Sequence, residues 1–186
     1  HNDSDNKFSL IHNGIIENHY SIKEYLISKG LKFKSDTDTE VLVQFISYIY
    51  KKKKLDFYNT VKLVLKEVKG TYGIVVMCID EPEKLVAAKN GSPLLIGIGD
   101  KENFLASDAS AILDETRNIF YLEDGEIAEI TKEAYKVTHI EHGQEIIKDI
   151  KEIEYSLDQI EKGTFKHFML KEIYEQPKAI EDAIRG

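Results

Sequence analysis

The stretch Gly73-Ile74-Val75-Val76-Met77 is apolar on both of its faces. Successive side chains of a strand point to opposite faces, so a strand with one face in water alternates apolar with polar residues. This stretch does not alternate, and it therefore predicts a strand that is covered on both sides. Helices on one face and a second sheet on the other would supply that cover, which favours a layered α+β architecture.

The segments around this strand fit those two kinds of layer. Apolar residues recur at helical spacing in residues 20–29, 41–50 and 57–68, which predicts a helical layer. Short apolar runs separated by Gly, Asp and Asn predict antiparallel strands joined by turns. These runs lie at 8–11, 71–79, 84–89, 94–99, 103–106, 118–122, 126–131 and 135–140. Pro177 interrupts a last helical pattern, so we expect a kink or two separate helices there.

Length and charge limit the classes of function. A chain of 186 residues, 42% hydrophobic and 31% charged, can form one domain with a sizeable core. Its net charge of −8 argues against a nucleic-acid surface. No apolar run is long enough to span a membrane, and no secretory signal pattern is present. The single cysteine excludes an internal disulfide and suits a reducing compartment, so we expect a cytoplasmic protein.

The segment His12-Asn13-Gly14 follows the first expected strand, at the turn before the first helix. The Asn13 side chain offers an amide donor, and Gly14 lets a ligand approach the backbone because it has no Cβ. Two such donors could stabilise the developing oxyanion of an acyl-transfer reaction. A plain Asn-Gly turn explains the same residues, and these residues alone do not separate the two interpretations.

Asp38 lies just before the second expected helix, among other residues with side-chain oxygens. Its carboxylate could cap that helix, and so could Asp36, Thr37 and Thr39. From the residues alone, helix capping is the simpler interpretation of Asp38.

The cysteine and the histidines give no second site. Cys78 lies in the apolar run and is expected to be a core residue rather than a nucleophile. His139 and His142 lack the further ligands that a metal site needs, so we predict no metal and no cofactor. His19 is expected at the start of a helix or on the surface.

Seven motifs, in this order, resemble one family of enzymes. They are His12-Asn13-Gly14-Ile15-Ile16-Glu17-Asn18, Ser35-Asp36-Thr37-Asp38-Thr39-Glu40-Val41, Gly70-Thr71-Tyr72-Gly73, Asn90-Gly91-Ser92-Pro93-Leu94, Ala106-Ser107-Asp108, Tyr121-Leu122-Glu123-Asp124-Gly125-Glu126 and His167-Phe168-Met169-Leu170-Lys171-Glu172-Ile173-Tyr174-Glu175-Gln176-Pro177. The chain resembles the glutaminase (class II glutamine amidotransferase) domain of glutamine–fructose-6-phosphate aminotransferase (isomerising). The last block is the most specific, because it resembles the connector to the sugar-isomerase half of that family. The resemblance implies the N-terminal-nucleophile (Ntn) hydrolase fold, a four-layer αββα sandwich.

The resemblance also implies a reaction. In that family an N-terminal cysteine attacks the side-chain amide of glutamine, with its own α-amino group as the base, and the ammonia aminates fructose 6-phosphate. Asn13 and Gly14 would form the oxyanion hole, and Asp38 would bind the α-ammonium group of glutamine. The implied partners are therefore glutamine, and fructose 6-phosphate through the isomerase domain, in a homo-oligomer without nucleic acid or membrane.

The chain departs from the family at its start. It lacks the N-terminal cysteine and the Arg-Trp-Ala-Thr-His-Gly motif, and it contains no tryptophan. We therefore expect a sandwich that is incomplete at its start, with the amidotransferase domain over residues 1–162. A connector helix over residues 163–186 would lead to an isomerase domain that is not present. Such a fragment is expected to be inactive alone.

Two alternatives to this function stay open. One is a catalytically inactive scaffold or interaction domain of the same fold. The other is the glutaminase domain of a sister enzyme such as amidophosphoribosyltransferase, which shares the Asn-Gly element.

Overall fold

The computed structural model describes residues 1–153, 165 and 167–185. The chain divides into two compact units, His1–Glu152 and Ile153–Gly186. The expected domain boundary at residue 162 lies outside the described residues, so the division at that point stays a prediction. In the part of the chain that the structure describes, no helix combines the length and the apolar character needed to cross a membrane.

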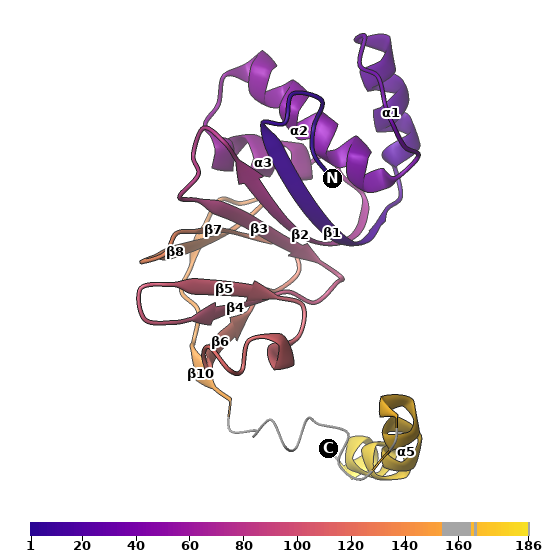
Figure 1. The fold of residues 1–186 in the computed structure, drawn as a ribbon, viewed down its shortest axis with the longest axis vertical. Helices are drawn as coiled ribbons and strands as arrows, with labels where there is room; N and C mark the ends of the chain where they lie inside the picture. The colour runs from indigo at the N-terminus through magenta and orange to yellow at the C-terminus, as the bar shows by residue number, and fades with distance from the viewer. Residues whose placement is uncertain (154–164, 166, 186) are drawn as a thin grey trace. The chain divides into compact units, whose positions relative to one another are not determined.

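Three α-helices cover one face of a sheet in the unit His1–Glu152 (Figure 1). They are α1 (His19–Ser28), α2 (Asp38–Lys53) and α3 (Phe57–Leu65). Side-chain oxygens cap two of them: Asp56 accepts from the Asn59 N–H at the start of α3, and Thr37 accepts from the Glu40 N–H at the start of α2. Lysines fill the last turn of α2, where positive charge complements the helix dipole.

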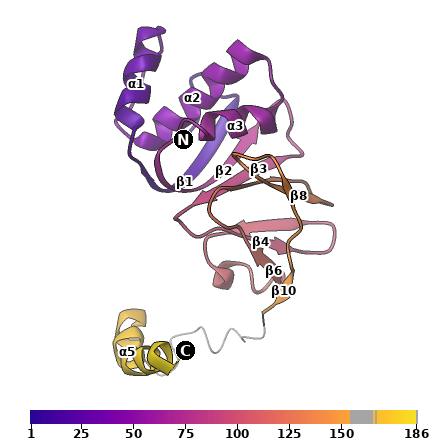
Figure 2. The ribbon, with the colours of Figure 1, turned by 180° about the vertical axis from the view of Figure 1, so that it is seen from behind.

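Two antiparallel sheets complete this unit, as both views show (Figures 1 and 2). The larger sheet has the order β1-β2-β3-β7-β8-β9 and the smaller one has the order β10-β6-β4-β5. The strands are β1 (Phe8–Ile16), β2 (Gly70–Cys78), β3 (Leu85–Asn90), β4 (Leu95–Ile98), β5 (Asn103–Ala106), β6 (Asn118–Tyr121), β7 (Glu126–Ile130), β8 (Tyr135–His139), β9 (Glu145–Ile146) and β10 (Lys151–Glu152), with a 3₁₀ turn η1 (Ala109–Ala111) after β5.

The core has two layers, one on each side of the larger sheet. On β2, Ile74 and Val76 pack with the helices, whereas Val75 packs with residues between the two sheets. The two-sided cover that residues 73–77 predict is therefore confirmed, and so is the α+β class. Of the two helical layers in a four-layer sandwich, the described residues of this unit form the one made by α1, α2 and α3.

The first strand is longer than the sequence suggests. The predicted strand ends at Ile11, but β1 continues to Ile16 and pairs along its whole length with β2. Asn13 lies opposite Gly73 and Gly14 opposite Tyr72. The prediction that Asn13 and Gly14 form the turn before α1 was wrong, because pairing with a neighbouring strand overrides the local turn preference of an Asn-Gly pair. Both residues therefore lie inside a strand at the edge of the larger sheet.

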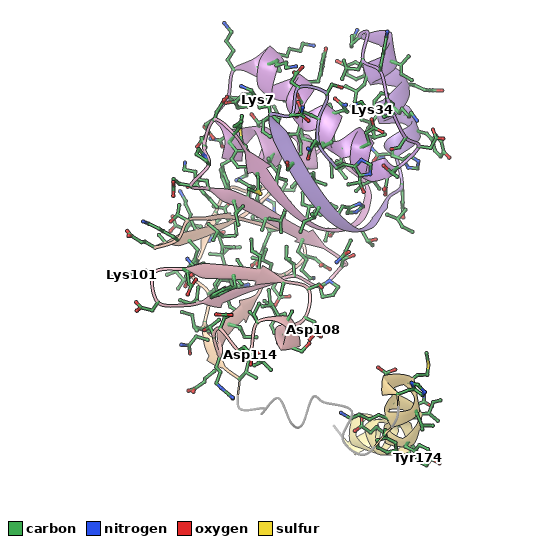
Figure 3. All side chains as sticks on the ribbon, viewed as in Figure 1. Lys7, Lys34, Lys101, Asp108, Asp114 and Tyr174 are labelled. Carbon is green, nitrogen blue, oxygen red and sulfur yellow. The ribbon has the colours of Figure 1, made fainter. Side chains whose placement is uncertain are left out.

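The second unit contains the helix α5 (Phe168–Arg185), which includes Pro177. One continuous helix forms here, so the option of two separate helices at Pro177 was wrong. Met169, Ile173 and Tyr174 leave much of their apolar surface exposed, and Tyr174 is labelled in Figure 3.

Candidate functional site

Gly14 has a backbone conformation and a packing that only glycine satisfies. Its φ angle is +129°, in the region that L-residues with a side chain rarely adopt. A Cβ atom at this position would lie 2.2 Å from the carbonyl oxygen of Thr71 and 3.0 Å from the Ser92 hydroxyl. Both the main chain of β2 and the turn after β3 therefore pack directly against the backbone of Gly14.

The N–H groups on one side of β1 are turned away from β2. The Leu10 N–H donates to the His1 carbonyl oxygen at 2.8 Å, and the Ile16 N–H donates to Asp38 Oδ2 at 2.8 Å. Backbone groups alternate in direction along an antiparallel strand. Gly14 lies an even number of residues from Leu10 and from Ile16. Its N–H is therefore expected to point away from β2, as theirs do.

The Asn13 side chain lies at a cavity between the two sheets. The cavity has a volume of about 300 Å³, and β1, β2, β5, η1 and neighbouring loops contribute to its wall. Its lining is mostly apolar: Ile11, His12, Asn13, Gly73, Val75, Leu94, Leu105, Ala106, Ser107 and Ala111. Asn13 is exposed to solvent and forms part of the cavity lining. Its Nδ2 group is thus available to a ligand.

Asp38 connects the start of α2 with β1. Thr37, not Asp38, caps the helix, so the capping interpretation of Asp38 was wrong. Instead, Asp38 Oδ2 accepts the Ile16 N–H at 2.8 Å, while Asp38 Oδ1 lies 3.4 Å from the Thr39 hydroxyl. The side chain keeps 20% of its surface exposed, so the carboxylate can still meet a cationic ligand. Among the described residues, Asp38 contacts the strand that carries Asn13 and Gly14 through Ile16 and His12.

A buried carboxylate, Glu40, fixes the loop before α2. Glu40 accepts from the Lys34 N–H at 2.8 Å and from the Ser35 N–H at 2.6 Å, and the Ser35 hydroxyl donates to it at 2.5 Å. Lys34 is labelled in Figure 3. Burial alone would raise the pKa of Glu40, but these hydrogen bonds outweigh burial and hold the pKa below its ordinary value. The loop that leads into Asp38 is therefore held in one conformation.

Two motifs to which the sequence analysis assigned no function, residues 90–94 and 106–108, lie beside Asn13 and Gly14. Ser92 contacts Gly14, and the preceding residues are held in place because the Asn90 side chain donates to the Gly70 carbonyl oxygen at 2.7 Å. Ser107 lines the cavity, and Asp108, labelled in Figure 3, accepts from the Ser110 N–H at 2.8 Å. Both motifs thus support the walls of the site.

His12 is the residue whose contribution the sequence left unassigned. Its side chain is almost fully buried on the helix side of the sheet, where its Nδ1 atom lies 3.2 Å from the Thr39 hydroxyl. The sequence could have indicated this placement, because successive side chains of a strand point to opposite faces. His12 lies on the same face of β1 as Leu10 and Ile16, which are both buried.

Other reactive side chains lie outside the site. Cys78 is buried in the core layer under the helices, as predicted, and burial raises the pKa of its thiol. His19 begins α1, with Nδ1 2.6 Å from the Ile16 carbonyl oxygen, as expected for a helix-start residue. His139 and His142 stack on each other with ring centroids 4.7 Å apart. Within the described residues, no group of three or more His, Cys, Asp or Glu side chains could hold a metal ion.

The layered fold places the chain in a class, the Ntn-type glutamine amidotransferases, because solved structures of that class match it. The solved structure of glutamine phosphoribosylpyrophosphate amidotransferase from B. subtilis matches 76% of this chain and 31% of its own, with a TM-score of 0.63 and 26% identity. A glutamine aminotransferase class-II domain protein from Silicibacter pomeroyi shares the fold, with a TM-score of 0.56 over 75% of this chain and 70% of its own, at 15% identity. A family model described as a glutamine amidotransferase domain matches residues 1–114, and the chain belongs to that family.

Curated relatives extend the similarity over nearly the whole chain. Glutamine–fructose-6-phosphate aminotransferase (isomerizing) from Chlorobaculum tepidum is 49% identical over 96% of this chain. The enzymes of that name from Bacteroides thetaiotaomicron and Aquifex aeolicus are 49% and 45% identical over 100% of it. The chain spans only 29%, 30% and 31% of the length of these three relatives, respectively.

Proposed function

We propose that this chain is the glutamine-hydrolysing domain of a glutamine–fructose-6-phosphate aminotransferase, which releases ammonia from glutamine for transfer to fructose 6-phosphate. The identity of 45–49% to enzymes of that name supports this function. The observation that carries the chemistry is Gly14, held at φ +129° against Thr71 next to the exposed amide of Asn13.

These two residues stabilise the oxyanion. When a thiolate attacks the side-chain amide carbon of glutamine, the C=O π electrons move to the oxygen. The Asn13 Nδ2 group and the Gly14 N–H donate hydrogen bonds to that oxygen, where the negative charge develops. The tetrahedral intermediate then collapses, the C–N bond breaks and ammonia leaves with a proton. Cys78 is buried, so the attacking thiolate is not its sulfur.

Asp38 binds the α-ammonium group of glutamine. Its carboxylate is fixed by the Ile16 N–H, two residues beyond Gly14 on the same strand. The remaining carboxylate lone pairs can accept charge-assisted hydrogen bonds from the ammonium group, which a ligand lacking that charge cannot supply. Holding one end of glutamine at Asp38 sets the position of its amide relative to β1.

The sister amidophosphoribosyltransferase is the second candidate. The solved amidotransferase from B. subtilis is 26% identical over 76% of this chain, so it is the more distant match. The aminotransferases from Bacteroides thetaiotaomicron and Aquifex aeolicus are similar over 100% of the chain, including the block Lys171–Pro177 within α5. These differences favour fructose 6-phosphate over a phosphoribosyl diphosphate as the acceptor.

The acceptor chemistry and the assembly follow from the same proposal. The fructose 6-phosphate site would belong to an isomerase domain outside residues 1–186, and the enzyme would be a homo-oligomer. The lone, buried and unpaired Cys78 is compatible with a reducing, cytoplasmic setting.

The test is to supply glutamine labelled with ¹⁵N at its side-chain amide to the full-length gene product that contains this chain. With fructose 6-phosphate we expect glutamate and ¹⁵N-labelled glucosamine 6-phosphate. Labelled phosphoribosylamine from phosphoribosyl diphosphate would instead favour the sister enzyme. Absence of glutamine hydrolysis with either acceptor would favour the inactive scaffold.

A further inference from the structure

The imidazole of His12 lies between the two parts of the proposed site. Its side chain is 2% exposed. On one side, Nδ1 lies 3.2 Å from the Thr39 hydroxyl and 3.8 Å from Asp38 Oδ1. On the other side, Nε2 lies 3.5 Å from the carbonyl oxygen of Thr71. The ring therefore contacts α2 and β2 at the same time.

Both contacts lead to groups that the proposed reaction uses. The Thr39 hydroxyl lies 3.4 Å from Asp38 Oδ1, so the imidazole and the carboxylate are joined through one hydroxyl group. The Thr71 carbonyl oxygen is the atom against which the backbone of Gly14 packs. The Thr39 hydroxyl has one proton and donates it to Asp38 Oδ1, so the connection uses the tautomer in which His12 Nδ1 carries the proton and donates to that hydroxyl.

Asp38 has two separate attachments to the strand of the oxyanion hole. The Ile16 N–H holds Oδ2 directly, and His12 reaches the Oδ1 side through Thr39. A carboxylate that is fixed at both oxygens cannot rotate about its terminal torsion, so its free lone pairs keep one direction. Such preorganisation lowers the cost of binding a ligand.

We propose that His12 is a positioning residue: it fixes the Asp38 carboxylate relative to Asn13 and Gly14, and so sets the affinity for glutamine. The inference rests on the proposed function, because it assumes that Asp38 binds the α-ammonium group. The competing explanation is that His12 only fills the core under β1, like any buried histidine with satisfied hydrogen bonds.

A double-mutant cycle in the full-length gene product separates these explanations. Glutamine KM and glutaminase kcat are measured for wild type, His12→Ala, Asp38→Asn and the double variant, with the melting temperature of each. If His12 acts through Asp38, His12→Ala raises KM about three- to tenfold, as the loss of one neutral hydrogen bond would, and changes kcat less. In the Asp38→Asn background, the same change leaves KM within about twofold.

Two further variants and one control separate a positioning role of His12 from a loss of folding. Thr39→Val keeps the side-chain volume but removes the hydroxyl that joins His12 to Asp38, so it should raise KM like His12→Ala even where His12→Ala folds poorly. His12→Asn retains a donor and should recover part of the affinity. His139→Ala changes a histidine that stacks on His142 and accepts the Glu141 N–H, outside the site, so it should leave KM and kcat unchanged.

The outcomes that overturn the inference are distinct. An equal rise of KM from His12→Ala in both backgrounds would mean that His12 acts independently of Asp38, and the inference would be wrong while the proposed function stands. An Asp38→Asn variant with the wild-type KM would remove the assignment of Asp38 itself, and the inference with it.

Discussion

A Cβ atom at Gly14 would lie 2.2 Å from the carbonyl oxygen of Thr71 and 2.7 Å from its carbonyl carbon. Both of these atoms belong to the main chain of β2, so they cannot move aside without breaking the pairing of β1 with β2. The glycine is therefore required by its neighbour as well as by its own φ angle of +129°.

Gly14→Ala should consequently destabilise the fold more than a change at another left-handed glycine. Gly30 is the matched control, because its φ is +89° but nothing lies within 4 Å of its Cβ position. Gly30→Ala should cost about 1 kcal/mol through backbone strain alone, whereas Gly14→Ala should cost about 3 kcal/mol or more. Urea unfolding of both variants measures the difference. Equal losses of unfolding free energy would show that β2 does not restrict Gly14.

Asp38→Asn should weaken the binding of glutamine without damaging the fold, because asparagine can still accept the Ile16 N–H. A charge-assisted hydrogen bond of about 1.5–3 kcal/mol corresponds to a KM about tenfold to a hundredfold higher. Steady-state glutaminase kinetics of the full-length gene product measure this. Asp36→Asn is the control: this carboxylate is fully exposed and pairs with Lys23, so its loss should leave KM unchanged. If both variants behave alike, Asp38 has no special role in binding.

Glu40 should make stability depend on pH in the acid range. Its pKa in the folded protein lies below the ordinary value of 4.5, because hydrogen bonds from residues 34 and 35 outweigh the effect of burial. Folding thus favours the ionised form. The stabilisation is present in full above about pH 4.5 and is lost as the pH falls through the lower folded-state pKa.

Glu40→Gln should therefore be less stable than wild type at pH 7, by about 1–3 kcal/mol. The difference should shrink as the pH falls from about 4.5 through the folded-state pKa of Glu40, since below that pKa both proteins carry an uncharged group at this position. Thermal unfolding followed by circular dichroism between pH 3 and pH 7 gives both curves. A difference in melting temperature that stays constant over this range would contradict the account of Glu40.

Cys78 should be inert in the folded protein. Burial raises the pKa of its thiol and hides it from reagents, so little thiolate is present at pH 8. We expect an aromatic disulfide reagent to modify it slowly in buffer and rapidly in guanidinium chloride. Cys78→Ala should lower stability but retain glutaminase activity in the full-length gene product. A loss of activity without a loss of stability would bring Cys78 back as a catalytic candidate.

The sequence predicts the layers of this fold well, because they depend on patterns that a strand and a helix leave in the chain. The run Gly73–Met77 is apolar on both faces of the strand. One face packs on helices and the other on a second sheet. The extent of β1 was harder to predict. Local turn preference at Asn13 and Gly14 indicated an end to the strand, whereas nine residues of pairing with β2 continue it.

The residue types of the site are visible in the sequence, but their contacts are not. That Thr37 rather than Asp38 caps α2 depends on which side chain turns toward the helix axis. The contact between Asp38 and Ile16 joins residues 22 positions apart and exists only once α2 packs on β1. The same packing makes His12 a neighbour of Thr39, so no local pattern could assign its contribution.

The central claim is that Asn13 and Gly14 stabilise the oxyanion of glutamine hydrolysis, and Asn13→Ala tests it most directly. The measurement is glutaminase kcat of the full-length gene product, with Asn118→Ala, an exposed asparagine on β6, as the control. We predict that Asn13→Ala lowers kcat by about 10²–10³ while KM and the melting temperature change little. A kcat equal to that of wild type and of Asn118→Ala would contradict the claim.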